Sequence, residues 1–154
     1  MKDQDILPFL KEEILHSTFC TLHFSDNYLL QVITAMKERV SFVKEFITNC
    51  QYFYTAPLEY EQKSIEKNWN AETPTHLKKI RGAFANLNDP TKENFEQALT
   101  TVAAELNIGK GKLIHPLRLA ISGISTGPGV FDIVTILGKD EVIKRIDTAL
   151  EKIK

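Results

Sequence analysis

Hydrophobic residues recur every three to four positions along almost the whole chain, a spacing that places them on one face of an α-helix. The clearest run opens at Asp26, where Ser25 and Asp26 can cap the first free N–H groups. We expect this helix to continue to near Asn49. Its apolar face comprises Leu29, Leu30, Val32, Ile33, Met36, Val40, Val43, Phe46 and Ile47. No convincing alternation of apolar and polar residues predicts a strand, so the pattern indicates an all-α protein.

The C-terminal half of the chain repeats the start and stop signals of helices. A capping side chain followed by proline opens one helix at Thr73–Pro74 and another at Asp89–Pro90 or Thr91. Gly109 and Gly111 then interrupt the pattern, where a backbone with positive φ is tolerated. Three further helices are expected at residues 112–123 around Pro116, from Pro128 to a stop at Gly138, and at residues 140–153.

A seam near Asn70–Thr73 divides this pattern into two parts. We therefore expect a helical bundle made of two small helical subdomains, residues 1–72 and 73–154. The aromatic segment QYFYTAP (residues 51–57) is predicted to be an extended connector packed on a core. Its rings, with Tyr60 and Trp69, are expected to pack inside, because aromatic side chains dominate core packing. The alternative is a surface that stacks unpaired nucleobases.

Composition and charge narrow the class of protein. No run of about 18 apolar residues occurs, so the sequence predicts no membrane span. The 19 basic and 20 acidic residues nearly cancel, which disfavours a nucleic acid or membrane held by charge alone. Between Leu106 and Phe131, however, there is no Asp or Glu, while Lys110, Lys112 and Arg118 are present. This basic strip suits a polyanion that contacts the protein at this one place. The alternative is a loop-rich stretch that happens to lack carboxylates.

Several reactive side chains lack the surroundings that their chemistry needs. His16, Cys20 and His23 would share one face of a helix, and Cys50 or Asp26 would supply a fourth metal ligand. The paired ligands of zinc knuckles are absent, which favours packing or solvent exposure instead. Neither cysteine lies in a strand-to-helix elbow and no phosphate-loop motif occurs, so a thiol enzyme and a nucleotide site are disfavoured. Two cysteines in such a chain indicate reduced thiols.

Arg118 is the most informative cation of the basic strip. It lies in an apolar helical segment between Leu117 and Leu119. Because burying an unpaired guanidinium is costly, this side chain must reach a partner or solvent. Its planar guanidinium can donate two parallel hydrogen bonds to a phosphate or to the edge of a base. A salt bridge to a carboxylate elsewhere in the bundle is the equally open alternative.

The segment from Gly109 to Leu150 carries a series of short motifs in order. They are Gly111-Lys112, Pro116-Leu117-Arg118, a helix ending at Gly123, a turn at Pro128 with Phe131 three residues on, Leu137-Gly138-Lys139, and Arg145-Ile146. In combination they resemble the carboxy-terminal anticodon-binding region of bacterial glutamyl-tRNA synthetases, which are class I aminoacyl-tRNA synthetases. The stretch from Lys37 to Trp69, with KERVSFVKEF and FYTAP, is similar to the helical domain that precedes it.

The resemblance implies which residues touch the anticodon. Matched by position, they are Arg118, Gly127, Pro128 and Val130, with Arg39 as the counterpart of an arginine that checks another anticodon base. The family often carries a hydroxyl residue where Gly127 stands, so only backbone and shape would act there. Lys110 and Lys112 are expected near loop phosphates, whose contacts position an RNA without specifying its sequence.

The same resemblance implies a function for the chain. We expect a tRNA-binding module that recognises the anticodon loop of tRNA(Glu) within a cytoplasmic glutamate–tRNA ligase. The Rossmann-type catalytic half is missing, so this chain is expected to be a fragment that performs no catalysis and needs no cofactor. ATP and magnesium would bind the catalytic domain of the same polypeptide. The alternative is a helical protein–protein interaction domain without an RNA role.

Overall fold

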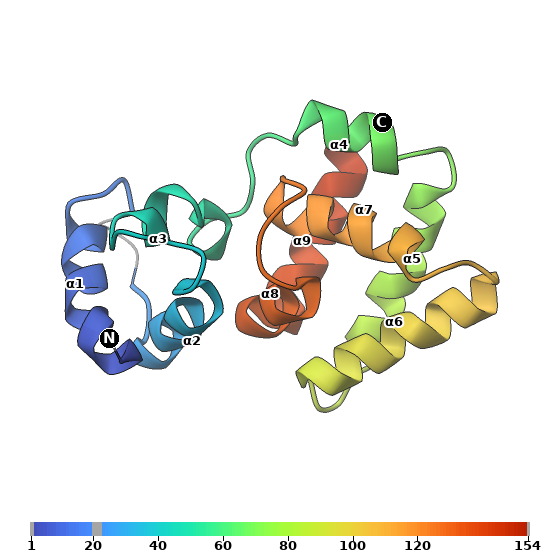
Figure 1. Ribbon diagram of the computed structural model, residues 1–154. Helices are drawn as coiled ribbons and strands as arrows, with labels where there is room; N and C mark the ends of the chain where they lie inside the picture. The colour runs from blue at the N-terminus through green and yellow to red at the C-terminus, as the bar shows by residue number, and fades with distance from the viewer. Residues whose placement is uncertain (1, 20–22, 154) are drawn as a thin grey trace. The chain divides into compact units, whose positions relative to one another are not determined.

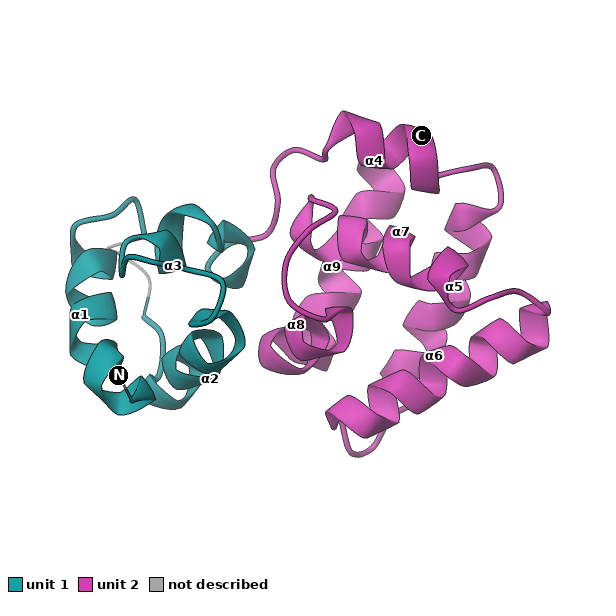
Figure 2. Cartoon of the chain, in the orientation of Figure 1, with its two compact units in different colours: residues 1–55 teal, residues 56–154 magenta. Residues whose placement is uncertain are grey.

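The computed structural model describes residues 2–19 and 23–153, and it divides the chain into two compact units, residues 1–55 and 56–154 (Figures 1 and 2). The described residues form helices joined by turns and contain no strand. The predicted all-α class is therefore confirmed. None of the helices in this part of the chain is long and apolar enough to cross a membrane.

The described residues of unit 1 form four short elements. They are α1 (Asp3–Leu15), α2 (Asp26–Met36), α3 (Glu45–Thr48) and the 3-10 helix η1 (Gln51–Phe53). The predicted cap of α2 is confirmed, because the Ser25 hydroxyl accepts the N–H of Tyr28 at 3.1 Å. The core lies between α1 and α2 and is closed by the residues of α3 and η1. Its fully enclosed members include Leu10, Val32 and Ile33.

The prediction of one helix from Asp26 to near Asn49 was wrong, because α2 ends at Met36. The chain then turns through residues 37–44 before α3 begins. The Glu45 carboxylate stabilises this turn by accepting the backbone N–H groups of Ser41 and Phe42, and these bonds lower the pKa of Glu45. The apolar spacing continues across the break because both helices face the same core, so periodicity alone could not locate it.

The aromatic segment after Cys50 belongs to the core of unit 1, as expected. Tyr52, Phe53 and Tyr54 are all buried, and the Tyr54 hydroxyl donates to the Phe46 carbonyl oxygen at 2.7 Å. Its aromatic residues are not extended, however: Gln51–Phe53 form the 3-10 turn η1, and Tyr54 follows in a helical backbone conformation. A tight turn lets three consecutive rings pack inward, which the alternating side chains of an extended chain could not do.

In the described residues of unit 2, one central helix packs against four of the five other helices. The elements are α4 (Gln62–Asn68), α5 (Thr73–Ala85), α6 (Lys92–Leu106), α7 (Gly111–Ser122), α8 (Val130–Leu137) and α9 (Lys139–Lys152). Helix α7 packs against α4, α5, α8 and α9, and α6 packs against α5 and α8 (Figure 1). Leu113, Leu117 and Ile121 on α7 have no exposed surface. The unit therefore has one core with α7 at its centre.

Helix boundaries in unit 2 follow the predicted signals with three differences. Thr73 does not cap α5 as predicted: it is the first residue of that helix, after Glu72, and its hydroxyl accepts the N–H of Asn70 at 2.9 Å. Thr91 caps α6 by accepting the N–H of Asn94 at 3.2 Å. Helix α6 ends at Leu106, and the following Asn107 adopts the left-handed conformation with φ 54°. That role was expected near Gly109 and Gly111, neither of which has a positive φ. Helix α8 begins at Val130, two residues after the proline expected to start it.

The division between the compact units lies at residues 55/56, whereas the sequence placed its boundary at 72/73. The reason is that α4 packs against α7 and so joins the C-terminal unit. The segment that leads into α4 also bonds to the end of α7, where the N–H of Glu61 donates to the Gly123 carbonyl oxygen at 2.8 Å. Residues 56–72 therefore belong with residues 73–154.

Candidate nucleic-acid interface

The exposed face of α7 carries the cations of the basic strip. Lys110 and Lys112 lie at its N-terminus and are exposed, and the first turn contains no acidic residue. His115 follows one turn later and is exposed, with its ring 3.9 Å from where a Cβ on Gly111 would be. Arg118 lies three residues further along and is half-buried. Residues three and four apart share a helix face, so this side of α7 is a continuous basic and imidazole-bearing surface.

Arg118 joins this surface to the segment that follows α7, the glycine turn (residues 123–129). Its Nη1 donates to the Pro128 carbonyl oxygen at 2.7 Å. A second bond holds the end of α7, because the Ser122 hydroxyl donates to the Arg118 carbonyl oxygen at 2.7 Å. The arginine and the proline turn, which the resemblance assigns together to the anticodon, thus form one local structure.

The side chains of the glycine turn divide between the core and the surface. Pro128 is buried and Val130 is only 3% exposed, whereas Ser125 and Thr126 are exposed and Gly127 is half-buried. The rings and methyl groups at positions 128 and 130 therefore fix the shape of the turn from inside. Anything that docks here would meet backbone atoms and the two hydroxyl residues rather than the Val130 side chain.

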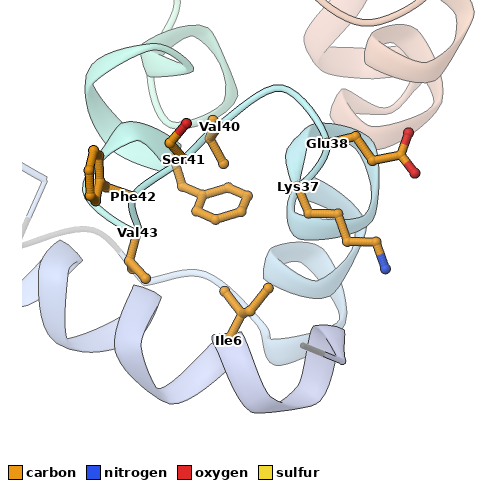
Figure 3. Close-up of a pocket in the computed structure, with 8 residues that line it drawn as sticks. Ile6, Lys37, Glu38, Val40, Ser41, Phe42 and Val43 are labelled. Atoms are coloured by element: carbon orange, nitrogen blue, oxygen red, sulfur yellow. The ribbon is translucent and has the colours of Figure 1, made fainter.

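Arg39 lies in unit 1, in the turn that follows α2, and it is exposed. The same turn borders a hollow of about 470 Å³, with Val40 and Phe42 on one side and Ile6 of α1 facing them (Figure 3). Lys37, at the rim, donates to Asp3 at 2.8 Å, and this bond raises the pKa of Lys37. The structure thus places Arg39 on a different unit from the other predicted contacts.

The candidate metal ligands lie partly outside the residues that the structure describes. His16 and His23 are both exposed, and Cys20 lies outside the described residues. No group of three or more His, Cys, Asp or Glu side chains able to hold a metal occurs in the part of the chain that the structure describes.

Cys50 is expected to be unreactive in the folded protein. It has no exposed surface, and burial raises the pKa of its thiol to about 12. Because the thiolate is the reactive form of cysteine, both the burial of Cys50 and the raised pKa of its thiol oppose its reaction with a thiol reagent. In a Cys20→Ser variant, we expect a disulfide reagent at mildly alkaline pH to label Cys50 only after urea is added. Rapid labelling of the native variant, measured by absorbance, would show that this core opens readily.

Two features of the interface escaped the sequence reasoning. His115 could have been found, because it lies three residues before Arg118 and so shares its helix face. The second feature is the Glu61 carboxylate, which accepts the N–H of Ser125 at 3.0 Å and its hydroxyl at 3.1 Å. These two residues are 64 positions apart, and no local pattern links them.

Comparison with known proteins gives consistent matches over nearly the whole chain. The family model described as an anticodon binding domain matches residues 4–150. The glutamate–tRNA ligase of Chlorobium phaeobacteroides is 39% identical over 96% of this chain, and that of Chloroherpeton thalassium is 38% identical over 83%. The chain spans only 30% and 25% of the lengths of these relatives.

Solved structures give the same match in three dimensions. The crystal structure of a glutamate tRNA ligase from Elizabethkingia meningosepticum, in complex with its amino acid, superposes with a TM-score of 0.94 at 32% identity. It covers 100% of this chain, which corresponds to 30% of that protein. The glutamate–tRNA synthetase of Elizabethkingia anophelis superposes with a TM-score of 0.88 at 30% identity, over 99% of this chain and 29% of its own.

Proposed function

Since the chain belongs to the anticodon-binding domain family of glutamate–tRNA ligases, we propose that it recognises the anticodon loop of tRNA(Glu). It does so as one part of a ligase whose catalytic domain lies outside these residues. The chain itself performs no chemistry. ATP and magnesium serve the catalytic domain, and the chain's own contribution is to bind and select the RNA in the cytoplasm.

The observation that carries this proposal is the bond between Arg118 and the Pro128 carbonyl oxygen. It fixes a guanidinium beside a turn whose backbone and hydroxyl residues reach the surface. Unpaired loop bases present both hydrogen-bonding edges and flat faces, and proteins read them with arginine, backbone groups and shape. Arg118 and the glycine turn supply these three elements within one short stretch of unit 2.

We assign the contacts with RNA phosphates to the N-terminal end of α7. Lys110 and Lys112 are exposed there, beside the positive end of the helix dipole. Contacts of this kind attract any RNA and set its orientation, whereas base contacts choose the sequence. Lys110 and Lys112 therefore contribute affinity, and Arg118 and the turn contribute selectivity. Arg39, on unit 1, is proposed to check a further anticodon base.

Arg118→Ala is expected to weaken binding of tRNA(Glu) by about 1–3 kcal/mol, the value of one good base contact. The measurement is a titration of fluorescently labelled transcript with the 154-residue chain. The matched RNA is the same transcript with exchanged anticodon bases, for which the variant and the wild type should differ little. Lys112→Ala is the control variant: it should weaken both RNAs equally and reduce the dependence of affinity on salt.

The outcomes separate the proposals. Equal affinity of the wild-type chain for both transcripts would contradict anticodon recognition. If the wild type discriminates but Arg118→Ala does so equally well, the assignment of Arg118 is wrong while the function stands. A folded chain that binds neither RNA would favour the helical protein-interaction module instead.

A further inference from the structure

The segment that enters unit 2 lies against the glycine turn along most of its length. We call residues 56–61 the linker strap. The N–H of Glu61 donates to the Gly123 carbonyl oxygen at 2.8 Å, and the Glu61 carboxylate accepts the N–H of Ser125 at 3.0 Å and its hydroxyl at 3.1 Å. The backbone and side chain of one residue thus bond to both sides of Ile124.

The strap and the turn also pack closely where they cross. A Cβ built on Gly123 would lie 2.7 Å from the Glu59 carbonyl oxygen and 2.8 Å from the Pro57 Cβ. Tyr60 is half-buried, and burial raises the pKa of its hydroxyl. The strap is therefore seated against the end of α7 rather than crossing it loosely.

The glycine turn needs such support because of its own composition. It contains three glycines, two of which have positive φ: Gly123 at 78° and Gly127 at 135°. A segment of this kind has many accessible conformations, and ordering it on binding costs affinity. In the structure it is held at Ser125 by Glu61 and at Pro128 by Arg118.

The charge of Glu61 makes its position informative. It brings a carboxylate to a segment that has no Asp or Glu of its own between residues 107 and 130. Next to an RNA-binding surface, a negative charge by itself disfavours binding. Any favourable effect of this carboxylate on RNA binding would therefore come from its hydrogen bonds to the turn.

We propose that Glu61 is a positioning residue for the RNA-binding site: by holding Ser125, it fixes the glycine turn in the conformation that reads the anticodon. This inference rests on the proposed function of the chain. Glu61 does not touch the RNA. It acts through Ser125, and its effect appears in selectivity between anticodons more than in overall affinity.

The test measures anticodon discrimination, the ratio of affinities for tRNA(Glu) and for the transcript with exchanged anticodon bases. Glu61→Ala is expected to lower this ratio by about threefold to tenfold, the effect of losing one or two ordering hydrogen bonds. Glu61→Gln should restore most of the ratio, since the amide oxygen still accepts the bonds from Ser125. Ser125→Ala, which keeps the N–H bond and loses the hydroxyl, should fall between them.

Glu59→Ala is the matched control, because it removes an exposed carboxylate from the same strap two residues earlier. It should leave the ratio unchanged. Amide hydrogen exchange at Ser125 is the readout independent of RNA, and it should quicken in Glu61→Ala while the thermal midpoint changes little.

If the wild type discriminates and Glu61→Ala discriminates equally, the inference is overturned while the proposed function stands. The inference is also overturned if Glu61→Gln behaves like Glu61→Ala, or if Glu59→Ala lowers the ratio as much. A wild-type chain without discrimination would instead remove the proposed function on which the inference rests.

Discussion

Gly123→Ala is expected to lower the free energy of unfolding of unit 2 by about 2–5 kcal/mol, through backbone strain and a steric clash acting together. Gly123 ends α7 in the left-handed region with φ 78°, which is unfavourable for any residue with a Cβ. The added methyl group would also lie 2.7 Å from the Glu59 carbonyl oxygen. Because that neighbour is backbone, the strap itself would have to move.

Urea unfolding followed by the fluorescence of Trp69 measures this effect. Trp69 is the single tryptophan of the chain and lies directly after α4 in unit 2, so its signal reports on that unit. Gly109→Ala is the matched control, since it has no positive φ and no heavy atom within 4 Å of the new Cβ. It should be close to neutral. Equal urea midpoints for the two variants would contradict the close packing of strap and turn.

Arg145→Met is expected to cost about 2–4 kcal/mol of unfolding free energy, because it removes charge-assisted hydrogen bonds and orphans a buried carbonyl. The Arg145 side chain on α9 is only 3% exposed. Its Nη1 donates to the Ile121 carbonyl oxygen at 2.8 Å, and its Nε donates to Glu141 at 2.9 Å. Methionine keeps the apolar stem, so the loss isolates the guanidinium.

A second arginine provides the control. Arg81 on α5 forms a two-point ion pair with Asp147 on α9, with bonds of 2.5 and 3.0 Å, but both side chains are more than one-third exposed. Exposed pairs are screened by solvent and contribute little. Arg81→Met should therefore leave the urea midpoint almost unchanged. Should the two variants lose equal stability, the special role of the buried bond to Ile121 would be refuted.

The sequence predicted the helical class and most of unit 2 because those features are local. Caps such as Thr91 and stops such as Gly138 act within a few residues, and the apolar stripe of α9 follows from its spacing. The break after Met36 was missed because it depends on a carboxylate nine positions later, at Glu45. A capping bond inside a continuing apolar pattern leaves no periodic signal.

In the candidate site, too, the residues were predictable from the sequence, but the contacts between distant residues were not. Arg118 and Pro128 were identified from the resemblance, yet their direct bond is visible only in the fold. Two other residues of the same family pattern donate to backbone carbonyls inside unit 2: Arg145 to Ile121, at the end of α7, and Lys139 to Leu87 at 3.0 Å. A motif records which residues recur in order but not whether each one faces solvent or a backbone carbonyl.

The linker strap limits how far unit 2 can be shortened from its N-terminal end. A shortened chain of residues 73–154 would keep α7, Arg118 and every glycine of the turn. Its sequence alone would not show that anything was missing. The shortened chain would also have lost the partner of Ser125 and exposed the side of α7 that α4 covers. A shortened version that keeps these contacts must therefore start at Ala56, because Glu61, which holds the glycine turn at Ser125, lies 64 residues before it.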